Sequence, residues 1–331
     1  MTAAPLLLTC GEPAGVAPEI TAAAWEALRD EPSSAFLLLG DAQYWRSRNP
    51  ALSVTEVSDP REATSVFRSA LPVLHRPFAA KPAPGKIDPA TAPQVIAAID
   101  EAVAMAFAGR IAGIITNPIQ KEALYGAGFR HQGHTDYLAH LSARHGRPVQ
   151  EVMMLVAEGL RAIPVTVHIP LKDVPGALTR QAILAQARVT AKDLRRFFGI
   201  ERPRLAFTGL NPHAGENGTM GREEIDIIIP ALRTLKEEGH DVIGPLPADT
   251  AFHPEARASY DAILCMYHDQ ALIPVKTLDF HGGVNVSLGL PFIRTSPDHG
   301  TALAIAGRGI ANPKSLIAAI RLAARMAEKA R

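Results

Sequence analysis

Short apolar runs alternate along the chain with longer segments of helical period. The runs that we predict as strands are residues 5–9, 35–39, 111–116, 152–156, 163–168, 204–208 and 261–266. Residues 92–108 and 223–238 place their apolar side chains on one stripe of a helix. This alternation is typical of βαβ units around a mostly parallel sheet. The Pro-rich residues 72–93 predict an ordered but irregular excursion.

The length of the chain predicts the number of domains, and its composition and net charge exclude several classes of protein. The 331 residues are about twice the usual ~150-residue domain, which predicts two domains or one large α/β unit. A net charge of +1 argues against a nucleic-acid or anionic-membrane binder. Cys10 and Cys265 are too few for a disulfide framework, and neither a signal-peptide pattern nor a membrane-length apolar run is apparent. We therefore expect a cytoplasmic protein without membrane or nucleic-acid partners.

Three histidines follow predicted strands, where ligands collect in open α/β sheets. They are His168, His213 and His268. One such histidine is usually a hydrogen-bonded structural residue, whereas three could converge on a divalent metal ion with an open position. Their spacing is too long for a local motif, so both interpretations stay open. Asp269 and Glu216 are candidates to orient an imidazole, or are simply solvated.

Two further groups of residues suit an anionic ligand. In residues 133–136, Thr135 could cap a helix, and His134 and Thr135 could also donate hydrogen bonds to a phosphate at that helix end. Lys276, Asn285 and Arg294 form the other group. Lysine and arginine usually lie on the surface, but Arg294 stands between apolar residues and a turn, and its planar guanidinium suits a phosphate or carboxylate.

The usual dinucleotide fingerprint is missing. Residues 11–15, Gly-Glu-Pro-Ala-Gly, do not spell G-x-G-x-x-G, and Glu12 would repel a pyrophosphate. A nicotinamide cofactor would have to bind elsewhere. Residues 298–302 and 305–313 read as a Gly-rich loop with a short helix that could present backbone donors to a dinucleotide.

Several blocks of sequence together resemble one enzyme family. They are residues 116–119, 133–135, 209–222, 244–250, 266–270 and 284–312. In these blocks the chain resembles the 4-hydroxythreonine-4-phosphate dehydrogenases of pyridoxal phosphate biosynthesis. The last block also resembles the NAD loop of isocitrate and isopropylmalate dehydrogenases.

The resemblance implies an architecture and a set of site residues. It implies two α/β/α domains with mostly parallel sheets and a cleft between them, in a homodimer whose subunits share each active site. We expect residues 1–125 plus 280–331 to carry the NAD loop, and residues 126–279 to carry the metal histidines and the dimer interface. The implied metal ligands are His168, His213 and His268, for zinc, magnesium or cobalt. The implied substrate contacts are His134, Thr135, Lys276, Asn285 and Arg294, and the candidate cofactor contacts are His299, Gly300, Thr301 and Asn312.

The implied reaction is oxidation of 4-phosphooxy-L-threonine by NAD or NADP. The β-keto acid so formed loses CO2 and leaves 3-amino-2-oxopropyl phosphate. Lys276 and Asp249 are candidates for the general base, although each could equally bind substrate or serve the fold. Related activities on 4-phospho-threonate, 4-phospho-erythronate or a cyclic diol dicarboxylate are the first alternative. A non-catalytic sensor of metal and phosphometabolites on the same scaffold is the second.

Overall fold

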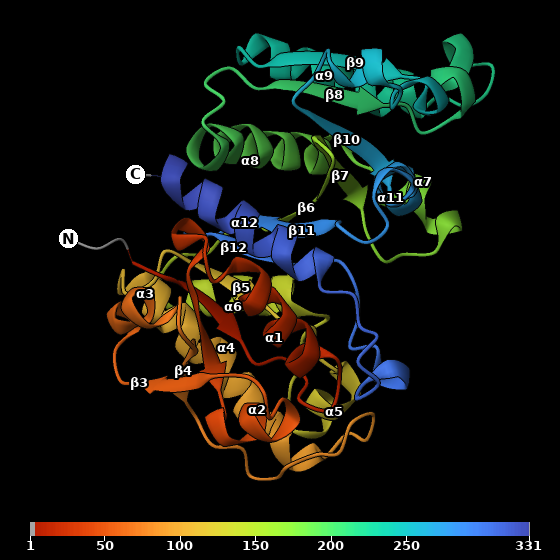
Figure 1. The fold of residues 1–331 in the computed structure, drawn as a ribbon. Helices are drawn as coiled ribbons and strands as arrows, with labels where there is room; N and C mark the ends of the chain where they lie inside the picture. Colours follow the sequence, from red (N-terminus) through yellow and green to blue (C-terminus); the bar gives the residue numbers. More distant parts are fainter. Residues whose placement is uncertain (1–3, 331) are drawn as a thin grey trace. The chain divides into compact units, whose positions relative to one another are not determined.

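The computed structural model describes residues 4–330, which divide into two compact α/β units (Figure 1). Unit 1 comprises the chain up to Val149 together with Leu290–Lys329, and unit 2 comprises Gln150–Gly289. This division corrects the predicted boundaries at two places. Residues 126–149 belong to unit 1, because their helix α6 (His134–Arg144) packs on α4 (Ala92–Phe107). Residues 280–289 belong to unit 2, because β11 (Val284–Leu288) pairs with β6 (Val152–Ala157).

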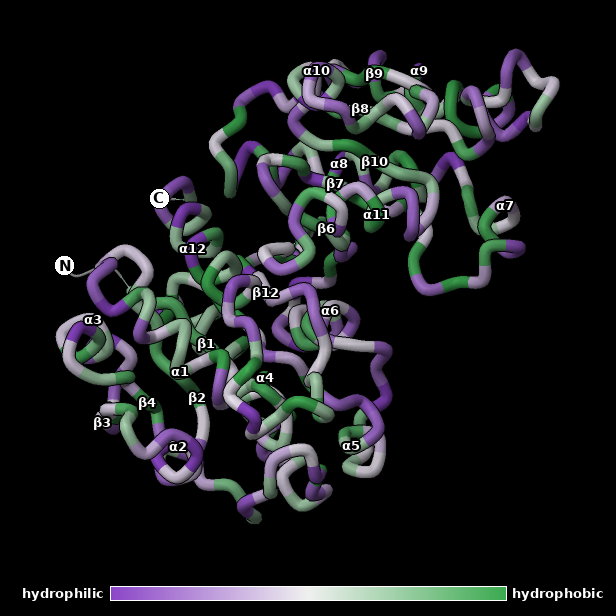
Figure 2. The backbone as a smooth tube through the Cα atoms, turned by 45° about the vertical axis from the view of Figure 1, so that its right-hand side comes forward, coloured by the Kyte–Doolittle hydropathy of each residue, from purple (hydrophilic) through white to green (hydrophobic). Residues whose placement is uncertain are grey.

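Unit 1 is built on a parallel sheet. Its strands run in the order β3 (Val54–Val57), β4 (Leu71–His75), β2 (Phe36–Gly40), β1 (Leu6–Thr9), β5 (Gly113–Thr116) and β12 (Arg294–Pro297). Strands β1, β2 and β5 are buried along their whole length, and β1 is hydrophobic in Figure 2. Its further helices are α1 (Ala17–Leu28), α2 (Ala42–Arg48), α3 (Ala63–Val66), α5 (Lys121–Gly126) and α12 (Lys314–Lys329).

The C-terminal helix returns to the N-terminal half of the chain. In Figure 1 the blue α12 lies against the red elements of unit 1, and it contacts α1, β5 and β12. This return explains why unit 1 is discontinuous in sequence. Among residues 4–330, Pro89–Phe107 alone is long and apolar enough to cross a membrane by length and composition. Its helix α4 contacts β1, β2 and β5, as a core helix does.

Unit 2 contains a mixed sheet. The strand order is β11, β6, β7 (Leu160–Thr166), β10 (Ala262–Tyr267), β8 (Arg204–Thr208) and β9 (Asp241–Leu246). Strand β6 is antiparallel to β11 and β7, whereas β7, β10, β8 and β9 are parallel. The helices of this unit are α7 (Val174–Ala177), α8 (Arg180–Phe198), α9 (Ile229–Glu237), α10 (Pro254–Arg257) and α11 (His268–Leu278). The predicted mostly parallel α/β class is confirmed.

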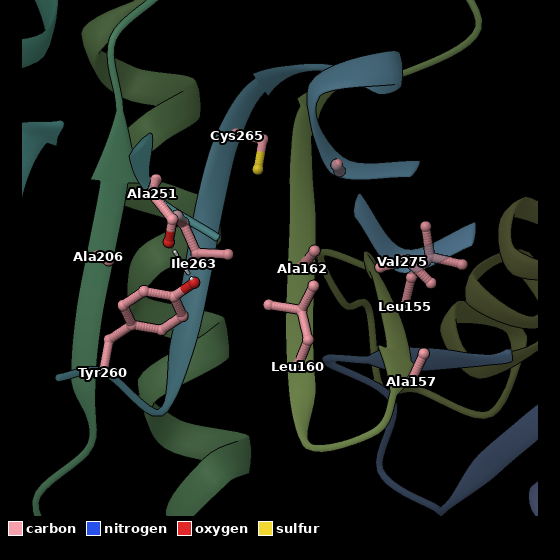
Figure 3. Packing of buried hydrophobic residues seen from close by; sticks show 11 residues of the cluster. Leu155, Ala157, Leu160, Ala162, Ala206, Ala251, Tyr260, Ile263, Cys265 and Val275 are labelled. Atoms are coloured by element: carbon pink, nitrogen blue, oxygen red, sulfur yellow. Dashed lines mark hydrogen bonds between the residues drawn. The ribbon is translucent and has the colours of Figure 1, made fainter. Parts of the chain in front are cut away.

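The core of unit 2 lies between its strands and helix α11. Figure 3 shows side chains of β6, β7 and β10 packed together, and the Tyr260 hydroxyl donates a hydrogen bond to the Ala251 carbonyl oxygen at 2.8 Å. Cys265 is buried and free in this core, as Cys10 is in unit 1. Burial raises the pKa of both thiols. Neither cysteine therefore has the exposed, thiolate-stabilising setting of a reactive residue.

All seven predicted strands are present, and the structure adds five more, β3, β4, β9, β11 and β12. Strand β3 is largely exposed and polar, and β9 is mostly solvent-accessible and interrupted by Gly244 and Pro245. Strand β4 includes Pro72, so the predicted irregular excursion of residues 72–93 is wrong at its beginning. Strand β12 reads Arg-Thr-Ser-Pro and is nonetheless fully buried. A buried polar strand has no hydrophobic signature, so apolar periodicity cannot find it.

Candidate active site

Two of the three strand-end histidines lie side by side in unit 2. His168 follows β7, and His268 is the first residue of α11, directly after β10. The two strands are adjacent and parallel, with Thr166 opposite Tyr267 in the register. The ring centroids of His168 and His268 are 5.5 Å apart, and the ring planes are inclined by 46°. The carboxyl ends of these strands therefore present a pair of imidazoles.

A hollow of about 320 Å³ surrounds the imidazole pair. Its other walls are Thr166, Ile169, Leu171, Val174, Tyr267 and Asp269. The carboxylate Oδ1 of Asp269 lies 2.7 Å from Nδ1 of His268. Because a carboxylate accepts hydrogen bonds, this contact favours the tautomer with a proton on Nδ1 and leaves Nε2 free to bind a ligand. Asp269 thus stands where an orienting partner was predicted.

His213 lies on a left-handed turn after β8. Every residue from His213 to Gly218 has a positive φ, with 51° at His213 itself. The loop that leads into this turn is fastened by the buried Glu224. Its carboxylate accepts hydrogen bonds from the backbone N–H groups of Leu210 and Asn211, both at 2.8 Å. Both His213 and Glu216, the other predicted orienting residue, are exposed.

One chain does not complete the predicted metal site. In residues 4–330, no three His, Cys, Asp or Glu side chains are arranged so that they could hold a metal ion. His168 and His268 are brought together, and their nitrogen donors suit zinc or cobalt. His213 stays outside this pair. Convergence of all three histidines is therefore not met within a single chain and remains a prediction for two chains.

Arg294 is a buried cation in unit 1. It begins β12, lies beside Ile114 of β5, and has 3% of its surface exposed. One guanidinium nitrogen, Nη2, donates a hydrogen bond to the Thr116 hydroxyl at 2.7 Å. Burial lowers the pKa of Arg294 to about 9, so the side chain is still charged at neutral pH. A charge buried in this way favours the binding of an anion.

His134 is the first residue of α6 and is held neutral by its surroundings. Burial lowers the pKa of this imidazole well below 6.5, and the positive charges of Arg294 and Lys121 lower it further. Its Nε2 atom is shielded from solvent and has no hydrogen-bond partner in the described part of the chain. A shielded nitrogen beside two cations, at the positive end of a helix, fits an oxyanion ligand.

The start of α6 differs from the predicted cap. Gly133 occupies the N-cap position and Thr135 lies inside the first turn, so the predicted capping role of Thr135 is wrong. The carboxylate of Asp136 instead accepts a hydrogen bond from the backbone N–H of Gln132 at 3.0 Å. Thr135 and His134 are consequently next to each other in the first turn of the helix, at the positive end of its dipole. Lys121 was not predicted; its nearness to the block 116–119 was the available signal.

The remaining predicted substrate and base residues belong to unit 2. Asn285 lies on β11 opposite Leu155, and its side-chain Oδ1 is shielded without a hydrogen-bond partner in residues 4–330. Lys276 is in the last turn of α11, with its Nζ atom 5.5 Å from the centre of the Phe280 ring. Asp249 is exposed and lines another hollow, of about 380 Å³, that Lys276 does not line. The two candidate bases therefore do not line this hollow together.

The Gly-rich segment after β12 forms a loop with one short helix, η8 (Leu303–Ile305), as predicted. His299 and Gly300 are exposed. Thr301 is anchored, because its carbonyl oxygen accepts a hydrogen bond from the Val16 N–H at 3.0 Å. The Asn312 side chain accepts a hydrogen bond from the Lys314 N–H at 3.0 Å, next to the start of α12. The structure thus gives Asn312 a structural contact at this helix.

Glu12 is buried after β1, and its Oε1 accepts a hydrogen bond from the Ala14 N–H at 2.9 Å. Burial raises the pKa of this carboxyl. The first loop of unit 1 is thus closed on the carboxyl group of Glu12, which agrees with its lack of a phosphate-binding fingerprint. The α/β fold, with polar side chains at the carboxyl ends of its strands, is the architecture typical of an enzyme of the α/β class.

Comparison with known proteins identifies the family within this class. The family model "Pyridoxal phosphate biosynthetic protein PdxA" matches residues 33–323, and the chain belongs to this family. The 4-hydroxythreonine-4-phosphate dehydrogenase of Caulobacter vibrioides is 54% identical over 331 residues, which cover 99% of each chain. The resemblance drawn from the sequence motifs is therefore confirmed. The chain is a dehydrogenase of pyridoxal phosphate biosynthesis.

Solved structures agree with this assignment. A crystal structure of 4-hydroxythreonine-4-phosphate dehydrogenase from Klebsiella pneumoniae has a TM-score of 0.87 and 37% identity, covering 98% of this chain and 100% of that one. A terephthalate 1,2-cis-dihydrodiol dehydrogenase from Burkholderia xenovorans has a TM-score of 0.66 and 29% identity, covering 98% of both chains. The scaffold thus also occurs with an activity on a cyclic diol.

Proposed function

We propose that the chain oxidises 4-phosphooxy-L-threonine with NAD or NADP, and that a divalent cation assists the oxidation and the subsequent loss of CO2. The observation that carries this proposal is the buried Arg294 beside the neutral His134. A buried guanidinium at a helix N-terminus suits the phosphate of such a substrate. The β-keto acid left by hydride transfer then loses CO2 and gives 3-amino-2-oxopropyl phosphate.

The phosphate would be bound by residues of unit 1. The guanidinium of Arg294 and the ammonium of Lys121 supply charge, while His134 and Thr135 supply hydrogen-bond donors at the start of α6. A neutral His134 can donate from Nε2 without adding a third positive charge. These fixed donors would hold the substrate in one orientation, which is where most of their catalytic value lies.

The cation would be held by His168 and His268 of one chain and by His213 of a second copy, in a homodimer. The pairing of two imidazoles in one chain, with His213 apart, supports this arrangement. When bound, zinc, cobalt or magnesium would supply Lewis acidity to the oxygen of the substrate alcohol. Asp269 would keep Nε2 of His268 directed at the ion by binding its Nδ1 proton.

The other proposed contacts are less constrained. Asn285 would bind a polar group of the substrate through its shielded amide, and Lys276 or Asp249 would accept the proton of the alcohol. The cofactor would bind near the segment that contains His299, Gly300, Thr301 and Asn312. We also place the protein in the cytoplasm, since its family acts in the biosynthesis of a cofactor from small phosphorylated compounds.

The second candidate activity is oxidation of a cyclic diol dicarboxylate, and the Burkholderia xenovorans relative favours it. A carboxylate could also be bound by Arg294. Activity on 4-phospho-threonate or 4-phospho-erythronate would use the same phosphate contacts. The shape of the whole substrate, and not the anion site alone, separates these alternatives.

A single set of assays tests the proposal. The protein, depleted of metal with a chelator, is given 4-phosphooxy-L-threonine, 4-phospho-threonate, 4-phospho-erythronate or the terephthalate cis-diol, each with NAD or NADP and with zinc, cobalt or magnesium. We expect metal-dependent NADH formation and CO2 release with phosphooxy-threonine, and loss of both in Arg294→Met. Higher kcat/KM on another compound would overturn the substrate assignment, and full activity in chelator would overturn the role of the metal.

A further inference from the structure

The glycine-rich segment of unit 1 is fastened to a carboxylate of its own chain. Glu19 lies in the first turn of α1. Its Oε1 accepts a hydrogen bond from the backbone N–H of Gly307, and its Oε2 accepts one from the N–H of Gly309 at 3.2 Å. These amides belong to the Gly-Arg-Gly sequence that would otherwise be the natural place for the phosphates of a dinucleotide. In this structure they are already bound to an anion.

The backbone conformation of the segment makes this contact possible. Gly307 and Gly309 have φ values of 80° and 68°. Left-handed residues next to right-handed ones turn successive N–H groups toward one side, which creates a concave binding surface for an anion. At Gly307 a side chain would also collide with Pro84, whose Cβ lies 2.6 Å from the position of an added Cβ. Gly307 is therefore required both by its conformation and by the space available.

A charged network holds the Glu19 carboxylate in place. Nη2 of Arg48 lies 3.8 Å from Oε1 of Glu19, and only 11% and 14% of the two side chains are exposed. Nη1 of Arg48 donates a hydrogen bond to the Tyr44 hydroxyl at 3.0 Å, and that hydroxyl is 2.8 Å from the carbonyl oxygen of Pro13. Because little water reaches these groups, their attraction is weakly screened. The carboxylate is consequently oriented before any ligand is present.

The segment buries little of its surface near Gly307. Residues 307–310 are exposed, and Ile310 has 64% of its surface accessible to water. A loop that buries so little apolar surface normally fluctuates. Helix η8 lies between two contacts to the rest of unit 1. Before it, the Thr301 carbonyl oxygen accepts a hydrogen bond from the Val16 N–H, and after it, the Gly307 N–H donates a hydrogen bond to Glu19.

We propose that Glu19 is a positioning residue for cofactor binding, which holds the Gly307 and Gly309 amides and so preforms the segment from Thr301 to Asn312. The proposal rests on the proposed use of NAD by this segment. In this proposal the Gly307 and Gly309 N–H groups bind Glu19 and do not bind the cofactor. The cofactor binds to the surface of the segment that Glu19 holds in place. Without the carboxylate, the energy of cofactor binding would have to order the segment, and affinity would fall.

The experiment compares Glu19→Ala and Glu19→Gln with a matched control, Glu26→Ala. Glu26 is on the same helix, its side chain is 67% exposed, and it contacts Arg29 at 3.5 Å. The first measurement is the rate of tryptic cleavage after the exposed Arg308, followed by mass spectrometry without cofactor. We expect cleavage of Glu19→Ala to be about tenfold faster, an intermediate rate in Glu19→Gln, and an unchanged rate in Glu26→Ala.

The second measurement is the affinity for the cofactor. We expect the Kd of NADH, by fluorescence titration, and the KM of NAD to rise about tenfold in Glu19→Ala, with kcat at saturating NAD unchanged. Glu19→Gln, which keeps one acceptor oxygen, should recover part of the affinity. A variant that is cleaved faster but binds NADH normally would overturn the proposal, as would a variant unchanged in both measurements.

The two measurements separate this inference from the proposed function. If the wild-type protein neither binds NADH nor forms it, the proposed function fails and the cofactor role of Glu19 fails with it. The cleavage rates would in that case still show whether Glu19 holds the segment. If the wild type is active and Glu19→Ala equals it in cofactor affinity, only the inference fails. If circular dichroism shows that Glu19→Ala does not fold, both measurements are made on Glu19→Gln.

Discussion

The carboxylate of Glu224 binds Asn211 twice, through the backbone N–H at 2.8 Å and through the side-chain amide at 3.0 Å. Asn211 is the N-cap residue of the turn η5 (Pro212–Gly218) that carries His213. A residue of the π-helical turn η6 (Glu224–Ile228) therefore fixes the loop from which a proposed metal ligand projects. Loop geometry and metal affinity should accordingly respond together when this carboxylate is changed.

Replacing Glu224 by alanine should destabilise unit 2 by about 3 kcal/mol, because three partly buried donors lose an acceptor. Glutamine should cost about 1 kcal/mol, since its carbonyl oxygen still accepts from the two backbone groups while its amide faces that of Asn211. Urea denaturation of both variants measures these differences. Equal stability of Glu224→Ala and wild type would contradict the fastening role.

His134 should make the free energy of unfolding depend on pH. The folded-state pKa of His134 is lowered, whereas an unfolded histidine titrates near 6.5, so the unfolded state binds more protons as the pH falls. Below about pH 6 the wild type should lose up to about 1.4 kcal/mol per pH unit relative to His134→Gln. Urea denaturation at several pH values, for both proteins, gives this comparison.

Added sulfate provides an internal control for that experiment. A bound dianion beside Arg294 favours the protonated imidazole and should therefore reduce the pH dependence of the wild type. His134→Gln should not show this reduction. A parallel response of the two proteins to sulfate would argue that the anion binds away from His134.

Asn285 should matter more for activity than for stability. Its shielded Oδ1 has no hydrogen-bond partner in the described residues, so Asn285→Leu removes a desolvated polar atom and should leave stability within about 1 kcal/mol of wild type. If the amide binds substrate, kcat/KM should fall by about a hundredfold. Denaturation and kinetics of this one variant are the measurements. Large destabilisation with normal kcat/KM would show that the amide serves the fold.

Mixing two inactive variants tests whether chains share a metal site. If His168 and His268 come from one chain and His213 from another, a mixed dimer of His168→Ala and His213→Ala contains one intact site. Random exchange of subunits should then restore about a quarter of the wild-type sites. The activity of the mixture is one measurement, and the number of metal ions bound per dimer, determined by mass spectrometry, is the second. No recovery after demonstrated subunit exchange would indicate a site completed within one chain.

Sequence alone determined the parts of this protein that repeat a local pattern. Apolar runs predicted β1, β2, β5, β6, β7, β8 and β10. The polar residues that follow these runs gave the candidate site residues His168, His213 and His268. Longer blocks such as residues 209–222 and 284–312 identified the family, because each combines several residue types in a fixed order and not merely a hydrophobic stripe. These features depend on residues close together in the chain.

The tertiary structure decided everything that depends on residues distant in sequence. It buried β12, a polar strand, at the end of the strand order of unit 1, where its pairing with β5 brings Arg294 to Thr116. It drew His168 beside His268 across adjacent strands and left His213 apart. It also gave Glu19 to the amides of Gly307 and Gly309, 288 and 290 residues away. Such pairings are decided by which surfaces pack together, and no local periodicity records them.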